Sequence, residues 1–580
     1  MHEDFYNAGI LIDPDRHWGV GWTSLQGSFS DCLPVWNEAR DLVLFFHGEH
    51  HADRRAVEDL KQRHAIAGAL DASHLIHLYE ERGEQFFQEL NGFFHGVLID
   101  FKNRRVVLFN DRYGMQRLYY HEAGGTLLFA SEAKAVLKLN RQLREIVPER
   151  LGEFLSMQCV LENKTLFRDV LLLPGAARWT YRDGVCESKE QYFQPDQWEN
   201  RPPVTSEQFY ESLKETYRSV LPGYLESPGP VGLSLTGGLD SRLILAGLPP
   251  APGSMACYTF ASGYNDSVDL KVAREVAQVC GQNHSTIRID RSFLDSFAQL
   301  AQKAVYISDG NLDAASGAVE LHVNKIARRI APVRVTGNYG SEILRTVRAF
   351  RHRVPDTNVF TSELIRHCEN ARQAFTRNLN GHPLTFAAFR QAPWYNYNRR
   401  TLEQSQLDTR TPFMDNRILA CAYGAPAEAI SNDEVFLRLL RDLHPALAAI
   451  RTNRGAGPGQ GRMWTKLLGA YQEFWHKAEH GYDYNLPQFA AKLDLLLKPL
   501  HLERVFLGRE KFFFFRIWYR DHLAEYLKEV LLDPESLNAP FVNRKQVESM
   551  VLSHTKGHGN HTKAITMLLT YVLTRRLLLR

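Results

Sequence analysis

A glycine-rich stretch, residues 231–242 (VGLSLTGGLDSR), carries side chains that could bind an anion. Apolar residues lead into Thr236, Gly237 and Gly238, and a helical pattern follows, which predicts a strand, a tight loop and a helix start. Consecutive glycines let backbone N–H groups turn toward a phosphate, and the helix start adds partial positive charge. Asp240 is a carboxylate in this anion site, which makes sense if Mg²⁺ bridges it to the phosphate. The alternative is a glycine-rich turn without a ligand, because short motifs recur by accident.

The elements around this loop predict a parallel sheet. Apolar strands alternate with helical patterns, the strands lying at residues 231–235, 255–262, 284–290 and 332–336. Such an order implies a sheet covered by helices on both faces, with ligands bound at the carboxyl ends of the strands. Two further strand ends therefore meet the loop, one near Ser262 and one at Thr336 and Gly337.

The first half of the chain has a different order. Helical segments at residues 56–70 and 73–90 precede a run of strands with hairpin turns between residues 92 and 137. This order predicts a layered α+β unit with an antiparallel sheet. The polar stretch QPDQWENRPPVTS separates the halves, so we predict one domain over residues 1–195 and another over 205–580.

Composition excludes several classes of function. The 580 residues are 44% hydrophobic and 23% charged with a net charge of +3, and no long basic run occurs, so neither nucleic acid nor a membrane is expected as a partner. No apolar run approaches the roughly 20 residues of a membrane helix. Seven cysteines without a CxxC pair favour reduced thiols and a cytoplasmic location.

Several separated motifs resemble those of asparagine synthetases. They occur in the order of that family: NDRYGMQRLYY (110–120), FASEAKAVL (129–137), LLPG (172–175), LSLTGGLDSR (233–242) and RTPFMDNRIL (410–419). The resemblance implies an N-terminal nucleophile hydrolase-like α+β domain with layered antiparallel sheets. An α/β parallel-sheet, ATP-pyrophosphatase-like synthetase domain with an all-α C-terminal part would follow it.

The same resemblance implies that ATP lies across three strand ends. The ATP-binding residues would be Leu235, Thr236, Gly237, Gly238, Asp240, Ser241, Ser262, Thr336 and Gly337, with Asp240 also binding Mg²⁺. In the family, ATP activates a carboxylate to an acyl-adenylate, and an amine then attacks it. Such chemistry needs a metal to offset pyrophosphate charge and a cation near phosphorus.

The synthetase half departs from the family at several positions. Ser341 stands where the family has a metal-binding Asp, whereas Glu342 is kept either for catalysis or to pair near a helix start. Asn453 stands where a Lys of a mobile loop approaches the phosphate, and the adjacent Arg454 is our candidate to replace that Lys. Arg242 either reaches the phosphate or pairs with an acid on a helix face; we favour the phosphate.

The glutaminase chemistry of the family does not carry over. Its nucleophile is a Cys after the initiator Met, but position 2 is His2, and an imidazole is no substitute for a thiolate here. The Asn-Gly-Glu motif of the glutamine site resembles His47, Gly48 and Glu49, with the Asn lost. Cys32, the nearest thiol, fits a small core residue better than a relocated nucleophile.

The last 120 residues are less informative. Residues 511–532 are apolar on nearly all sides, which predicts a buried helix, and core packing explains its aromatic residues better than a substrate pocket does. A metal site at His554, His558 and His561 is disfavoured because glycines break the helix that zinc ligands usually share.

We therefore predict an asparagine-synthetase-like, ATP-dependent carbon–nitrogen ligase that releases AMP and pyrophosphate and has an inactive glutaminase half. Its partners would be a small-molecule or peptide carboxylate and either ammonia or a substrate amine, and a homodimer is a compatible assembly. The alternative is a non-catalytic, nucleotide-binding regulatory pseudoenzyme, which the changes at Ser341 and Asn453 favour.

Overall fold

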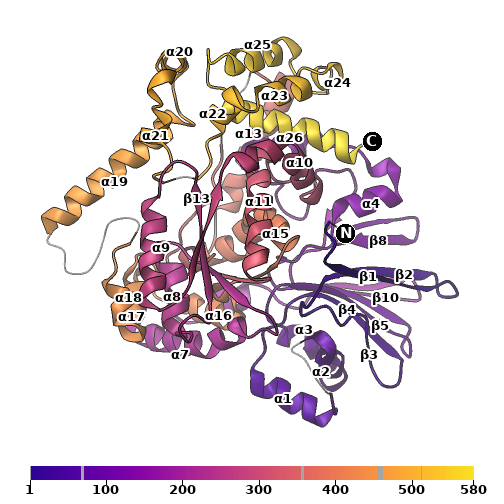
Figure 1. Ribbon diagram of the computed structural model, residues 1–580. Coiled ribbons are helices and arrows are strands. Elements are labelled where there is room, and N and C mark those ends of the chain that lie inside the picture. Colours follow the sequence, from indigo (N-terminus) through magenta and orange to yellow (C-terminus); the bar gives the residue numbers. More distant parts are fainter. Residues whose placement is uncertain (1, 67–70, 354–357, 453–461, 511) are drawn as a thin grey trace.

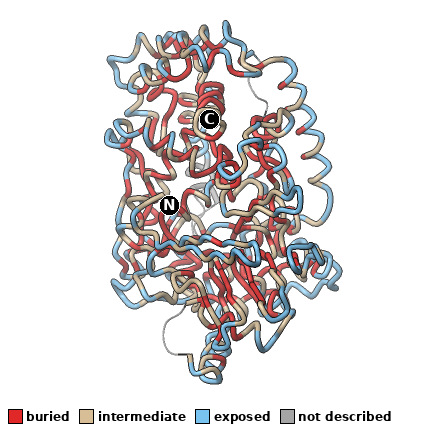
Figure 2. The backbone as a smooth tube through the Cα atoms, turned by 90° about the vertical axis from the view of Figure 1, so that its right-hand side faces the viewer, coloured by how far each residue is buried: buried red, intermediate tan, exposed pale blue. Residues whose placement is uncertain are grey.

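The computed structural model describes residues 2–66, 71–353, 358–452, 462–510 and 512–580. An antiparallel, sheet-rich half, coloured indigo to purple, lies beside a half built on a parallel sheet and a C-terminal group of helices (Figure 1). Buried segments run through the interior of both halves, and exposed residues concentrate at the periphery (Figure 2).

The first half is built on a six-stranded antiparallel sheet with the order β11-β10-β6-β5-β4-β3. The strands are β3 (Val35–Trp36), β4 (Leu42–Gly48), β5 (Phe94–Asp100), β6 (Arg105–Asn110), β10 (Ala177–Arg182) and β11 (Val185–Gln191). Every residue of β5 is buried, so both faces of the sheet are covered. One face packs on α2 (Leu75–Arg82) and α3 (Phe86–Glu89), near α1 (Arg54–Arg63). The other packs on two hairpins, β1 (Tyr6–Asp13) with β2 (Trp18–Leu25) and β7 (Tyr119–Ala123) with β8 (Thr126–Ala130). These layers confirm the predicted α+β class.

The second half contains the predicted parallel sheet, with the order β14-β13-β12-β15-β16. Its strands are β12 (Val231–Ser234), β13 (Ala256–Ser262), β14 (His284–Ile289), β15 (Val333–Thr336) and β16 (Asp408–Arg410). The first four were predicted, whereas β16 is too short to give a periodic signal. Helices α7 (Ser206–Leu225), α8 (Leu239–Gly247) and α9 (Val268–Val279) cover one face, and α10 (Arg291–Ile307) and α11 (Ala314–Ile330) cover the other.

The two halves share a hydrophobic core. Phe93 and Tyr113 of the first half belong to one buried cluster with Leu233 and Phe413 of the second. Helix α5 (Pro148–Met157) also lies against α13 (Ser362–Asn378). The chain passes from the first half to the second after α6 (Asp196–Glu199). The domain limits 1–195 and 205–580 stay a prediction.

Helices form the C-terminal part, as predicted. They include α22 (Phe515–Asp521), α23 (Ala524–Leu531), α25 (Arg544–Thr555) and α26 (Thr562–Leu578). The single helix expected over residues 511–532 is two helices divided at His522. Phe515 packs on Phe297 of α10 with 5.7 Å between ring centroids, so this aromatic stretch is part of the core. Among the described residues, no helix is both long and apolar enough to cross a membrane.

Candidate functional site

The glycine-rich loop lies between β12 and α8, at the carboxyl edge of the parallel sheet. The Thr236 N–H donates to Ser241 Oγ at 3.1 Å, and the Gly238 N–H donates to Thr236 Oγ1 at 3.3 Å. Gly238 is the N-cap of α8 and makes no side-chain cap, a helix start that can bind a phosphate. Asp269, which no sequence motif singled out, accepts the Gly237 N–H through its Oδ1 at 2.8 Å.

The segment after β15 closes one side of this loop. A Cβ on Gly337 would lie 2.5 Å from the Ser241 nitrogen, and a Cβ on Gly340 would lie 2.6 Å from Asp240 Oδ1. Only glycine therefore lets residues 337–340 pack directly against the start of α8. The structure thus brings together the first and last predicted strand ends.

The other predicted nucleotide-binding residues are buried. Leu235 belongs to the hydrophobic cluster beneath α7, α8 and α9, and Thr336 Oγ1 accepts the Asn338 N–H at 3.3 Å. Ser262 Oγ accepts two N–H groups of the turn after β13, and a Cβ on Gly508 would overlap it. These side chains stabilise the backbone conformation at the carboxyl ends of the strands.

Two carboxylates and an arginine meet beside the loop. Asp240 Oδ2 accepts the Ser341 hydroxyl at 2.8 Å and lies 3.5 Å from Arg345 Nη2, whereas its buried Oδ1 has no hydrogen-bond partner among the described residues. Burial raises the pKa of Asp240, and burial with the nearby Asp240 charge raises the pKa of Glu342 to about 7. Arg345 forms its other ion pair with Asp433. An unpartnered oxygen beside a second carboxylate fits a divalent cation such as Mg²⁺.

Arg242 does not bind at the phosphate side of the loop, contrary to our expectation. Its side chain is buried and donates to the carbonyls of Leu447 at 3.2 Å, Ile450 at 2.7 Å and Arg451 at 3.0 Å. It also donates to the Gly237 carbonyl at 3.2 Å, and burial lowers its pKa to about 10. Arg242 therefore ties the glycine-rich loop to the end of α18 (Pro445–Ala449).

The proposed catalytic Arg454 and the neighbouring Asn453 lie outside the described residues. Their roles stay predictions.

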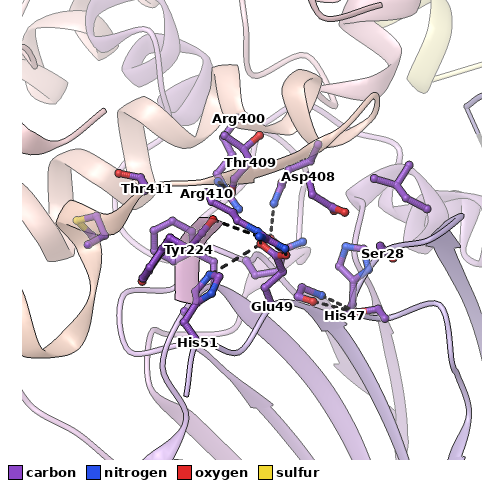
Figure 3. Close-up of a pocket in the computed structure, with 18 residues that line it drawn as sticks. Ser28, His47, Glu49, His51, Tyr224, Arg400, Asp408, Thr409, Arg410 and Thr411 are labelled. Carbon is purple, nitrogen blue, oxygen red and sulfur yellow. Dashed lines mark hydrogen bonds and ion pairs between the residues drawn. The ribbon is translucent and has the colours of Figure 1, made fainter. Parts of the chain in front are cut away.

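A cavity of about 50 Å³ lies between the two halves, and its lining includes His47, Gly48 and Glu49 (Figure 3). We call the residues that line it the second cluster, and the group of Asp240, Glu342 and Arg345 beside the loop the first cluster. Glu49 accepts Arg410 Nε at 2.8 and 3.0 Å and Nη2 at 2.6 Å. Arg410 Nη1 donates to the Glu226 carbonyl at 2.6 Å. The sequence motif contained Arg410 but gave no sign of Glu49 as its partner, 361 positions away.

Burial shifts the titration of this second cluster. Burial lowers the pKa of His47 and of His51 to about 4, so both imidazoles are neutral at neutral pH. Burial alone would raise the pKa of Glu49, but the Arg410 charge and hydrogen bonds hold it below its ordinary value. Burial and the Glu49 charge raise the pKa of Asp408 to about 7. Since one water needs roughly 10–15 Å³ of such a cavity, the space holds a few waters.

A direct contact links the two clusters. Thr411, which follows Arg410, donates from its Oγ1 to the Asn338 carbonyl at 2.6 Å. Asn338 lies in the 337–340 segment that packs on the glycine-rich loop. The end of β16 thus touches both clusters.

Two protein-family models match this chain. A glutamine amidotransferase domain matches residues 28–193, and asparagine synthase matches residues 223–447. These matches agree with an antiparallel first half and a parallel-sheet second half.

Named relatives match at lower identity. Asparagine synthetase [glutamine-hydrolyzing] 2 of Arabidopsis thaliana is 26% identical over 387 residues, 62% of this chain and 60% of the relative. Asparagine synthetase B [glutamine-hydrolyzing] of Escherichia coli is 23% identical over 488 residues, 78% of this chain and 79% of the relative. The chain spans about 60% of the length of the Arabidopsis relative. A solved glutamine phosphoribosylpyrophosphate amidotransferase from B. subtilis covers 47% of this chain and 76% of its own at 11% identity. Its TM-score with this chain is 0.23.

Proposed function

Because this chain belongs to the asparagine synthetase family, we propose that it is an ATP-dependent amide ligase whose glutaminase-like half no longer hydrolyses glutamine. The observation that carries the proposal is the intact loop from Thr236 to Ser241, held against Gly337 at the carboxyl edge of the sheet. Open sheets of this kind bind ligands at that edge.

In the proposed reaction, a carboxylate oxygen attacks the α-phosphorus of ATP and the bond to the pyrophosphate oxygen breaks. An amine nitrogen then attacks the acyl carbon, loses a proton, and AMP leaves. The α8 N–H groups and the loop hydroxyls would orient the pyrophosphate. Asp240, through Oδ1, and Glu342 would hold Mg²⁺, which supplies charge neutralisation for the departing pyrophosphate. Arg454 is proposed to meet the charge at phosphorus.

Occupation of the glutamine-like motif by an internal ion pair supports the proposed loss of glutamine hydrolysis. Arg410 engages both oxygens of Glu49, so the carboxylate of that motif already has a partner within the chain. None of the residues that line the cavity there is a cysteine. Burial raises the pKa of the Cys32 thiol to about 12, so that thiol is not an activated nucleophile.

We further propose a cytoplasmic enzyme that acts on a small-molecule or peptide carboxylate. Its nitrogen would come from ammonia or a substrate amine, since position 2 is His2 rather than Cys and Glu49 is paired with Arg410. No nucleic acid or membrane partner is proposed, and a homodimer is compatible with the proposal.

Exchange of labelled pyrophosphate into ATP tests this proposal. We expect exchange with at least one member of a panel of carboxylates, including aspartate, and a loss of about 100-fold or more in Asp240→Asn. Asp295→Asn, an exposed carboxylate on α10, is the matched control and should leave exchange unchanged. ATP binding without exchange on every carboxylate would contradict the ligase proposal. Glutamate release from glutamine would contradict the proposal for the first half.

A nucleotide-binding pseudoenzyme is the second candidate. The observation that favours it is Arg345, which lies 3.5 Å from Asp240 Oδ2 and donates to Ser341, so a cation already compensates that carboxylate. This candidate predicts saturable ATP binding with no exchange.

A further inference from the structure

Two histidines and a glutamate gather on the helical layer of the first half, away from both clusters described above. His64 follows the last residue of α1, and His77 and Glu80 lie on α2, below the six-stranded sheet in Figure 1. One ring nitrogen of each histidine and one carboxylate oxygen of Glu80 lie within 4.8 Å of one another. The two imidazole rings stack with 4.6 Å between centroids.

Both ring nitrogens of His77 face carboxylates. Its Nδ1 lies 2.8 Å from Glu80 Oε2, and its Nε2 lies 3.6 Å from Glu38 Oε1. A metal ion bound at one ring nitrogen leaves the other as an N–H that donates to a neighbouring carboxylate, which is the usual arrangement of a metal-ligating histidine.

The second carboxylate oxygen of Glu80 is already oriented. Asn37 Nδ2 donates to Glu80 Oε1 at 2.8 Å, and Asn37 is buried. An outer hydrogen bond that fixes a ligating carboxylate is typical of metal sites. His64 Nε2 lies 2.9 Å from Glu81 Oε1, which places a further oxygen beside the group.

We propose that His64, His77 and Glu80 bind one divalent ion of the zinc class. Two imidazoles and a carboxylate are ligands that zinc accepts, with water as the fourth because Arg63 already pairs with both oxygens of Glu81, whereas Mg²⁺ and Ca²⁺ favour oxygen ligands. Zinc bonds of about 2.0–2.1 Å place tetrahedral ligands about 3.4 Å apart, so the most distant pair of the present atoms needs to close by at most about 1.4 Å, and His77 Nδ1 and Glu80 Oε2, now 2.8 Å apart, would open slightly.

The ion would link the end of α1 to α2, because its ligands come from both segments. The side chains of His64 and Glu80 are 25% and 28% exposed, so they have room to turn, whereas His77 is 7% exposed and fixed in the layer. The site therefore stabilises the helices that cover the sheet, and it is independent of the proposed ligase chemistry.

Zinc titration of the metal-stripped full chain tests this site. We expect one tight site by calorimetry and a rise in Tm with Zn²⁺, and Co²⁺ should give the visible absorption of a tetrahedral complex. His64→Ala and Glu80→Gln should weaken binding by about 100-fold or more and abolish the Tm rise. The Tm of His64→Ala without metal should match that of the wild type, since the side chain is partly exposed.

Two control variants separate this site from other histidines. His501→Ala removes a histidine that pairs with a single glutamate at 2.8 Å, and His476→Ala removes one that contacts His480 at 4.3 Å between centroids on α19 (Arg462–Tyr482). Both should bind Zn²⁺ like the wild type. Unchanged binding in His64→Ala, loss of binding only in His476→Ala, or no tight Zn²⁺ site in the wild type would each overturn the proposal.

Discussion

Replacing Glu49 by Gln probes the ion pair that joins the two halves. The substitution keeps the size of the side chain and removes its charge, leaving the buried Arg410 without the carboxylate that hydrogen-bonds to it. Three close contacts of 2.6–3.0 Å join the two side chains, which are 11% and 9% exposed. The amide retains one acceptor oxygen and turns an N–H₂ group toward the guanidinium.

The structure gives the expected magnitude. Breaking a buried, hydrogen-bonded ion pair by removing one partner costs about 3–5 kcal/mol, because the remaining charge is uncompensated. An exposed pair such as Arg438 with Glu207 contributes under about 1 kcal/mol, so Glu207→Gln is the matched control. Glu49→Gln should therefore lower the urea midpoint of unfolding far more than Glu207→Gln does.

The pH dependence of this loss has a definite sign. The folded-state pKa of Glu49 is lowered, so its stabilisation is present above the unfolded pKa of about 4.3 and disappears as pH falls through the folded pKa. The difference between wild type and Glu49→Gln should be full at pH 7 and should shrink in strong acid. Urea unfolding followed by fluorescence, at pH 7 and in strong acid, measures this difference in stability. Equal midpoints for the wild type and Glu49→Gln at pH 7 would refute this account of the interface.

Three further predictions concern single positions. Gly337→Ala should weaken ATP binding at least about tenfold, because its Cβ would lie 2.5 Å from the Ser241 nitrogen, whereas Gly481→Ala, with open space around it, should bind normally; equilibrium dialysis distinguishes them. Arg242→Lys should lower Tm in scanning fluorimetry, since one ammonium cannot reach four carbonyls, and an unchanged Tm would be inconsistent with the observed bonds. Asp408 has a folded pKa of about 7, raised above its unfolded value, so its stabilisation is full below about pH 4 and is lost as pH rises to 7. Asp408→Asn should flatten the stability profile over that range, and a profile that still falls equally steeply would contradict the assignment.

The sequence predicted the elements whose signals are local. Glycines and hydroxyls around Asp240 marked the loop, and alternating strands and helices marked the parallel sheet and placed Gly337 at the same edge. Both rest on rules that read adjacent residues or element order.

Pairings between distant residues were beyond such rules. Nothing near Arg410 or Glu49 indicates that a guanidinium and a carboxylate 361 positions apart satisfy each other. Arg242 was expected near phosphate because of its place beside the loop, but the carbonyls at the end of α18 accept its hydrogen bonds. His64 follows the end of α1 and His77 lies on α2, so no helical spacing indicated that they are neighbours.

We propose that the loop around Asp240 uses ATP to adenylate a carboxylate, and oxygen-18 in both carboxylate oxygens of the best substrate from the exchange panel tests this directly. Mass spectrometry should find one oxygen-18 atom per AMP formed, and Asp240→Asn should form no detectable labelled AMP. Unlabelled AMP, or label found in inorganic phosphate together with ADP, would contradict it.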